Sequence, residues 1–140
     1  MQDRPTAVEL LKAAREFCER ELGPSLDGRM RFQVRVLQNI LGTLEREWEH
    51  EEDALIAEWG RLKHVLQKDG DRPDTFKALG SQVRGWNVEL AAQIRAGTLD
   101  ERSGELLDLL TETVREKIAI ANPDYASSAT SAGASERSTR

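Results

Sequence analysis

Apolar residues that recur at alternating steps of four and three are the feature that most constrains the fold of this chain. The clearest run is Met30, Val34, Leu37, Leu41, Leu44 and Trp48, which a helix of 3.6 residues per turn presents along one side. Comparable runs occur in four other stretches, with turn residues between them. The last two predicted helices should face the core with Phe76, Leu79, Val83, Trp86, Leu90 and Ile94, and with Leu106, Leu107, Leu110, Val114, Ile118 and Ala121. The pattern therefore predicts an all-α fold, a five-helix antiparallel bundle with short connections.

Local signals place the ends of the five predicted helices. Thr6 and Glu9 form the reciprocal S/T-x-x-E cap of the first helix, and Gly23-Pro24 should end it. The other predicted boundaries are Asp27 as the cap of the second helix, Gly70 at the end of the third, Asp74 or Thr75 before the fourth, Gly97 after it, Asp100 at the start of the fifth, and Asn122-Pro123 at its end.

The second predicted helix differs from the others because Phe32, Val36 and Ile40 add another apolar strip beside the main run. We therefore expect it to be the most buried helix. Its end, near residues 48–52, contains no Gly or Pro. The alternative of a single long helix that runs on to residue 68 stays open at this stage.

Length and composition predict one helical domain, residues 1–125, followed by a disordered C-terminal tail, residues 126–140, that is rich in Ser, Ala and Thr. The single cysteine, Cys18, lies on the apolar face of the first predicted helix, which favours a buried structural thiol. No apolar run reaches the length of a membrane span, and the N-terminus lacks a secretory signal pattern. We therefore expect a cytoplasmic protein that does not enter a membrane.

The charge pattern argues against a nucleic-acid partner. Charged residues make up 32% of the chain, the formal net charge is -5, and the two signs are interspersed. Nucleic-acid binders usually carry a dense basic face that neutralises phosphates. We therefore expect no nucleic acid among the partners.

The sequence contains no G-x-S-x-G elbow, Walker A loop or G-x-G-x-x-G turn. Glu47 and His50 have the Glu-x-x-His spacing of di-iron bundles, but those sites need this motif twice. His64 has Arg61 at the equivalent position, so a solvated helix end is the preferred interpretation of Glu47 and His50. We predict no catalytic residue, no metal site and no cofactor.

Three polar residues fall within apolar stripes and are candidate site residues: Glu21, Asn87 and Lys117. In a bundle, Glu21 and Lys117 would meet as an ion pair where the first and fifth helices end, or bend out to solvent along their methylene stems. Asn87 would contact a ligand or serve as a buried amide that fixes helix register.

Arg31, Arg35 and Asn39 stand at successive steps of four on the second predicted helix, so their side chains stack on one side. Two guanidinium groups and an amide can hold a phosphate or a carboxylate. The alternative is that these arginines pair with acidic residues of adjacent helices. The candidate ligand-binding residues are therefore Arg31, Arg35, Asn39, Asn87, Lys117 and Glu21.

Four short blocks occur in a recognisable order. They are Arg4-Pro5-Thr6 with Glu9-Leu10-Leu11, then Asp27-Gly28-Arg29-Met30-Arg31-Phe32 with Val34-Arg35-Val36 and Asn39, then Ile94-Arg95-Ala96-Gly97 with Asp100, and finally Lys117-Ile118-Ala119 with Asn122-Pro123. Over about residues 4 to 125 the chain resembles a family of small bacterial proteins described only as a domain of unknown function. The resemblance implies an all-helical fold and genes beside a kinase-like phosphotransferase and an acyl-CoA dehydrogenase homologue, but no activity. It singles out Arg31, Arg35, Asn39, Lys117 and Asn122.

Two functions of different classes fit these observations. The first is a small non-catalytic accessory or interaction protein that forms a homodimer or packs against a partner enzyme through its amphipathic helices. The second is a bundle that uses Arg31, Arg35 and Asn39 to bind an anion, such as an acyl-CoA or a phosphorylated metabolite. We take the first as the main hypothesis, since it requires no catalytic residue.

Overall fold

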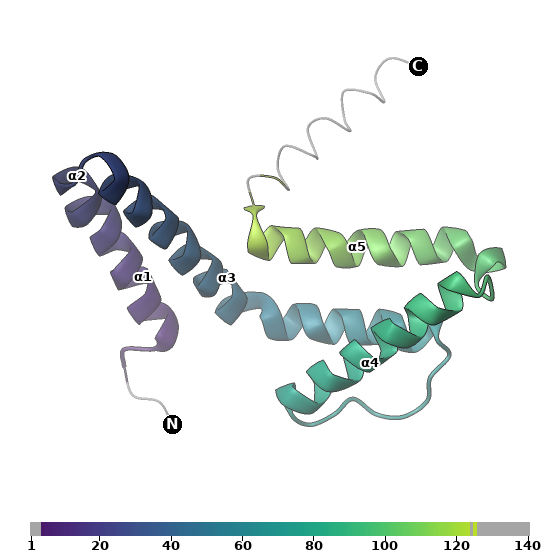
Figure 1. The fold of residues 1–140 in the computed structure, drawn as a ribbon. Coiled ribbons are helices and arrows are strands. Elements are labelled where there is room, and N and C mark those ends of the chain that lie inside the picture. The colour runs from purple at the N-terminus through teal and green to yellow at the C-terminus, as the bar shows by residue number, and fades with distance from the viewer. Residues whose placement is uncertain (1–3, 124, 126–140) are drawn as a thin grey trace, which may run out of the picture. The chain divides into compact units, whose positions relative to one another are not determined.

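The computed structural model describes residues 4–123 and 125, and the regular elements within this part of the chain are helical (Figure 1). Four long helices carry the fold: α1 (Ala7–Phe17), α3 (Gly28–Val65), α4 (Phe76–Arg95) and α5 (Ser103–Ala121). Shorter helical segments are η1 (Cys18–Leu22), α2 (Gly23–Ser25) and η2 (Asp100–Arg102). The all-α prediction is confirmed, but the five expected helices are four long ones. The predicted tail, residues 126–140, lies outside the described residues.

The helix count differs because the second and third predicted helices are one continuous helix, α3, of 38 residues. The acidic stretch at residues 49–53 contains neither Gly nor Pro, so nothing in the backbone interrupts the hydrogen-bond ladder there. Glutamate, alanine and leucine, which dominate this stretch and the turns after it, are good helix formers. The charged residues 49–53 therefore lie in the interior of a helix, because neither Gly nor Pro interrupts the backbone there.

The first helical segment begins where the sequence predicts. The Thr6 side chain accepts a hydrogen bond from the Glu9 N–H at 3.2 Å, and the Glu9 carboxylate accepts one from the Thr6 N–H at 2.7 Å. The predicted stop at Gly23-Pro24 is wrong, because the backbone stays helical to Ser25. A π-helical turn over η1 widens the ladder, and Pro24 then sits in the first turn of α2, where its missing N–H is not needed.

The end of α3 also departs from expectation. Gln67, not Gly70, adopts the left-handed conformation that closes the helix, with φ of 50°, and the Lys68 N–H reaches back to the Lys63 carbonyl at 2.9 Å. The predicted boundaries of the next helix are confirmed. Thr75 caps α4 by accepting from the Ala78 N–H, and Gly97 follows its last turn with φ of 72°.

Contacts divide the chain into two compact units, and the boundary lies within α3. Unit 1 contains the described residues up to Glu51 together with Ile120–Asn122, and unit 2 contains Glu52–Ala119 with the described residues after Asn122.

The hydrophobic core lies in unit 2, among side chains of α3, α4 and α5 and the turn before η2. Its buried members are Leu62, Val65, Leu66, Leu79, Val83, Leu90, Leu99 and Leu109. Trp59 and Trp86 stack beside it with ring centroids 5.8 Å apart, and the Trp59 indole N–H donates to Gln82 at 2.8 Å. The predicted inward faces are confirmed at the centre of α4.

The inward face of α5 is rotated from the predicted one. Leu107 and Val114, which were expected to face the core, are exposed, whereas Leu109 and Thr113 are buried. The leucines at residues 106, 107, 109 and 110 span about 160° of the helix circumference, so periodicity alone does not select which part of that arc faces the core.

Candidate functional site

Five large apolar side chains form an exposed row along the first half of α3, within unit 1. They are spaced by four residues and are exposed as follows: Phe32 65%, Val36 41%, Ile40 52%, Leu44 42% and Trp48 65%. We call this set the α3 row. Residues four apart lie above one another on a helix, so the row is one continuous apolar ridge. Soluble monomers rarely expose such a contiguous ridge, so the α3 row is a candidate contact surface.

The row is exposed because unit 1 contains too few helices to cover it. The α1 helix turns back beside the first half of α3 (Figure 1), where Arg15 Nε donates to Glu45 Oε1 at 2.8 Å. This hydrogen bond raises the pKa of Arg15 above its ordinary value. Val34 and Gly42 are buried on the covered side, and Leu41 is half-buried. The expectation that residues 28–51 form the most buried helix is therefore wrong.

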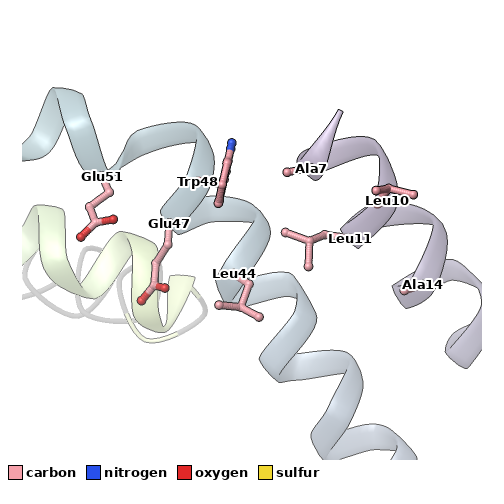
Figure 2. A pocket seen from close by; sticks show the side chains of 8 residues that line it. All are labelled: Ala7, Leu10, Leu11, Ala14, Leu44, Glu47, Trp48 and Glu51. Atoms are coloured by element: carbon pink, nitrogen blue, oxygen red, sulfur yellow. The ribbon is translucent and has the colours of Figure 1, made fainter. Parts of the chain in front are cut away.

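The hairpin of α1 and α3 also encloses an apolar groove of about 600 Å³. Figure 2 shows Leu11 projecting from α1 toward Leu44 and Trp48 of α3. The lining residues are Ala7, Leu10, Leu11, Ala14, Leu44, Glu47, Trp48 and Glu51. The groove meets the α3 row at Leu44 and Trp48. Glu47 and Glu51 make the edge of the groove acidic. Such a groove suits an apolar segment that has basic residues beside it.

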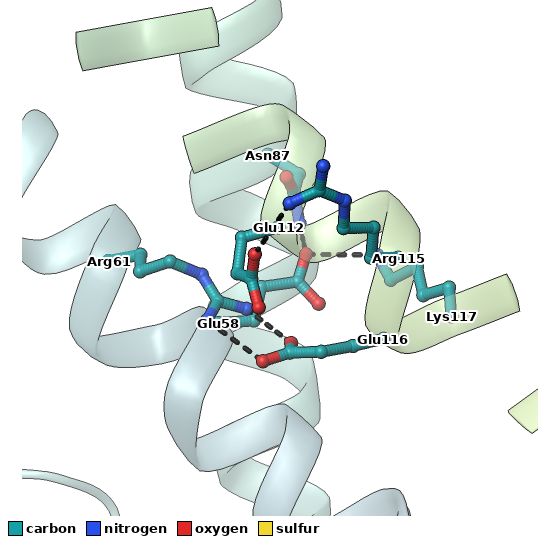
Figure 3. Close-up of polar contacts among 7 residues, drawn as sticks. All are labelled: Glu58, Arg61, Asn87, Glu112, Arg115, Glu116 and Lys117. Atoms are coloured by element: carbon teal, nitrogen blue, oxygen red, sulfur yellow. Dashed lines mark hydrogen bonds and ion pairs between the residues drawn. The ribbon is translucent and has the colours of Figure 1, made fainter. Parts of the chain in front are cut away.

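A buried carboxylate in unit 2 gathers two of the predicted polar residues. Glu58 of α3, whose side chain is 6% exposed, accepts from Asn87 Nδ2 at 2.8 Å and from Lys117 Nζ at 3.0 Å (Figure 3). Asn87 also donates to the Val83 carbonyl at 3.1 Å. We call Glu58, Asn87 and Lys117 the Glu58 cluster. The cluster joins α3, α4 and α5 through the Glu58 carboxylate, and its two donors supply the partners that a buried charge requires.

The sequence places Glu58 at a core position of α3, although a glutamate is not normally expected there. Glu58 lies three residues after Leu55 and four before Leu62, inside the apolar stripe of α3. Sequence reasoning identified the amide and the ammonium of the cluster but missed the carboxylate that they share. Lys117 pairs with Glu58, and Glu21 is exposed in unit 1. Asn87 is half-buried, and its amide joins α4 to α3 through Glu58.

A second ion pair lies next to this cluster. Arg61 of α3 and Glu116 of α5 form a two-pronged pair, with Arg61 Nη1 at 3.0 Å from Glu116 Oε1 and Nη2 against Oε2 (Figure 3). Arg115 instead pairs with Glu112 on the exposed side of α5, at 3.5 Å. The Arg61–Glu116 pair holds α3 and α5 together, and none of these charged residues lines the apolar groove of unit 1.

The predicted arginine strip lies on an open surface. Arg31, Arg35 and Asn39 are all exposed, and in the described part of the chain neither guanidinium group has a hydrogen bond or an ion pair. Arg46, on the same side of α3, instead donates to the Ile120 carbonyl at 2.7 Å and to Thr43 at 3.1 Å. The acidic partners that the alternative interpretation expected for Arg31 and Arg35 are therefore not in place. Asn122 lies just past the end of α5 and is exposed.

Unit 2 also has a polar cavity of about 460 Å³, where α3 ends. Its lining includes Lys63, His64, Lys68 and Arg102. These cations already have acceptors: Lys68 pairs with Glu89 at 2.7 Å, and Arg102 pairs with Glu105 at 2.8 Å. The Arg102 hydrogen bond lowers the pKa of Glu105. The neutralised cations make this cavity a poor anion site.

Among residues 4–123 and 125, no group of three or more His, Cys, Asp or Glu side chains is placed to hold a metal ion. Glu47 and His50 are both exposed on α3, and Cys18 is buried as the sequence predicts. None of the helices in the same range combines the length and apolar character that crossing a bilayer requires.

Comparison with protein families gives one match, to a family described as a domain of unknown function, DUF6285, over residues 24–125. The matched range includes the α3 row and the Glu58 cluster. No curated protein and no solved structure matches the chain.

Proposed function

The chain belongs to the DUF6285 family, whose description assigns no activity, and we propose from its geometry that it is a protein-interaction module. The α3 row docks against another polypeptide in this proposal, and the neighbouring groove extends the contact. The observation that carries the proposal is the exposure of five large apolar side chains in one continuous ridge. Contact surfaces are enriched in aromatic anchors, and Phe32 and Trp48 stand at the two ends of this ridge.

The division of apolar surface between the two units supports this function. Unit 2 places eight apolar residues in a common core, whereas the described part of unit 1 buries only Cys18 and Val34 among its apolar residues. A helical hairpin with so little buried surface gains little stability from its own packing. Docking of the α3 row on a partner supplies the missing burial.

Oxidative footprinting of the chain in living cells tests this function. Hydroxyl radicals oxidise accessible methionine and tryptophan side chains, and Met30 and Trp48 are both more than half exposed in the single chain. We expect a partner to reduce Trp48 labelling to the level of the half-buried Trp59 and Trp86. The Ile40→Glu variant should restore full labelling, since a charge in the middle of the row opposes docking.

The control for this experiment is Val88→Glu, which places the same charge at an exposed site on α4 in unit 2. Trp48 should stay protected in that variant. Full labelling of Met30 and Trp48 in the wild-type chain inside cells would show that nothing covers the α3 row, and the proposal would fail.

A second function, anion binding by Arg31 and Arg35, has one observation in its favour: both guanidinium groups are exposed and have no acidic partner in the described part of the chain. A phosphate or a CoA phosphate group fits two stacked guanidinium groups. The arrangement is weaker than the α3 row because no cavity described here surrounds the arginines.

A thermal-shift measurement with inorganic phosphate and with CoA separates the two functions. Anion binding raises the melting temperature of the wild-type chain, because a ligand that binds only the folded state stabilises it. The Arg35→Ala variant should lose that increase, while the exposed Arg20→Ala on η1 should keep it. Equal melting temperatures with and without these anions would remove this second function.

A further inference from the structure

We infer that the polypeptide that covers the α3 row is a second copy of this chain, packed with its own α3 row in the antiparallel direction about a two-fold axis that crosses the row at the level of residue 38. The inference rests on the proposed function and adds the identity of the partner and the direction of the contact. Three observations carry it: the distribution of charge along α3, the spacing of its side chains, and the exposed apolar area of unit 1.

Charge changes sign along the first part of α3. Residues 28–44 contain three arginines and no acidic residue, and residues 47–53 contain five acidic residues and no lysine or arginine. The side chains of Arg29 and Glu47 make no hydrogen bond or ion pair with other residues of the described chain. A parallel partner helix would bring like charges together, whereas an antiparallel copy brings the basic end against the acidic end.

The spacing of the residues makes this arrangement self-complementary. Arg29 and Glu47 are 18 residues apart, which is about five helical turns, so both lie on the same side of α3. A two-fold axis at residue 38 relates positions that are equally far before and after it. Arg29 of each copy then faces Glu47 of the other, which gives two symmetric ion pairs at the ends of the contact.

The apolar residues between these ends obey the same symmetry. Val36 faces Ile40 of the second copy, and Phe32 faces Leu44. All four lie within about 60° of the direction of Arg29 and Glu47 around the helix, at roughly 100° per residue. Rows of side chains spaced by four residues are also the ridges that most often interdigitate between packed helices. Two hairpins joined in this way make a four-helix arrangement.

The exposed apolar area of unit 1 is large enough for a stable dimer. Nine of its described apolar side chains are exposed: Leu10, Phe17, Met30, Phe32, Val36, Leu37, Ile40, Leu44 and Trp48. Together they expose on the order of 1,000 Å², and each partner in a stable interface contributes about 800 Å². Residues 126–140 contain no Leu, Ile, Val, Met or aromatic residue, so the C-terminal segment lacks side chains to replace a second copy.

Sedimentation of the full chain over a range of concentrations tests the inference. We expect the wild-type chain to be a dimer, and Ile40→Glu to be a folded monomer with unchanged helical content. Arg29→Glu and Glu47→Arg should each raise the dissociation constant by about tenfold, because each reversal turns two attractive contacts into repulsive ones. The double variant, Arg29→Glu with Glu47→Arg, should restore the wild-type value.

Glu49→Arg is the matched control, since it makes the same charge change two residues further on, about 200° around the helix from Glu47. It should leave the dissociation constant unchanged. A monomeric wild-type chain, a dimer that tolerates Ile40→Glu, or a double variant as weak as the single ones would each overturn the inference. A monomer whose Trp48 is nevertheless protected inside cells would leave the proposed function in place with a different polypeptide as partner.

Discussion

Replacement of Leu62 by alanine lowers the free energy of unfolding by about 3 kcal/mol. Leu62 lies on α3 in unit 2 and is fully buried in the core cluster. The substitution removes the transfer free energy of the lost methyl and methylene groups, and it leaves a cavity that neighbours such as Leu79 and Leu90 fill only partly. Urea denaturation of the Ile40→Glu background, followed by circular dichroism, measures the loss without a contribution from assembly.

Leu107→Ala is the matched control for this prediction. Leu107 lies on α5 in the same unit, and it is 65% exposed. The same chemical change there should alter the free energy of unfolding by no more than about 0.5 kcal/mol, as for other surface substitutions. If the two variants lost equal stability, the core would not lie where the structure places it.

The sequence predicted those parts of the fold that depend on local chemistry. The cap at Thr6, the cap at Thr75 and the left-handed Gly97 each depend on a few neighbouring residues, and all three are confirmed. The end of α3 was missed because a glutamine, Gln67, adopts a conformation that glycine usually supplies. The charged stretch at residues 49–53 suggests a helix end only weakly, because it contains no Gly or Pro to interrupt the backbone.

The sequence predicts which residues form helices better than it predicts which helix faces are buried. Periodicity shows that Phe32, Val36 and Ile40 share a side of α3, but it does not show whether another helix covers that side. The prediction of a buried second helix assumed five helices in one bundle. With α1 as the main neighbour of α3 in unit 1, the same apolar pattern becomes an exposed surface. A pattern that indicates a core in one arrangement indicates an interface in another.

Two of the polar residues inside apolar stripes belong to the Glu58 cluster, which joins helices, and not to a cavity that could hold a ligand. Asn87 and Lys117 were identified because unpaired burial of either is costly, and both contact Glu58. Their partner could not be assigned from sequence, since it depends on which helices are neighbours. Glu21 and Lys117 lie in different units, which the assumption of a single bundle did not anticipate.

Lys117→Met costs about 2 kcal/mol of unfolding free energy, because it leaves the buried carboxylate of Glu58 with the Asn87 amide as its remaining donor. The Lys117 side chain is 61% exposed, so solvent screens part of the attraction and keeps the loss below that for a fully buried pair. The methionine keeps the length of the aliphatic stem, so packing along α5 changes little. Urea denaturation in the Ile40→Glu background again gives the value.

A double-mutant cycle with Glu58→Met isolates the charge contribution. Once Glu58 is methionine, no buried carboxylate is left without its partner, and Lys117→Met should then cost less than about 0.5 kcal/mol. Arg115→Met, two residues earlier on α5, removes only an exposed pair with Glu112 and should also have a small effect. If Lys117→Met cost the same with and without Glu58, the cation would stabilise the helices by packing alone. The Glu58 cluster would then not be the electrostatic junction of α3, α4 and α5 that its 2.8 Å and 3.0 Å contacts indicate.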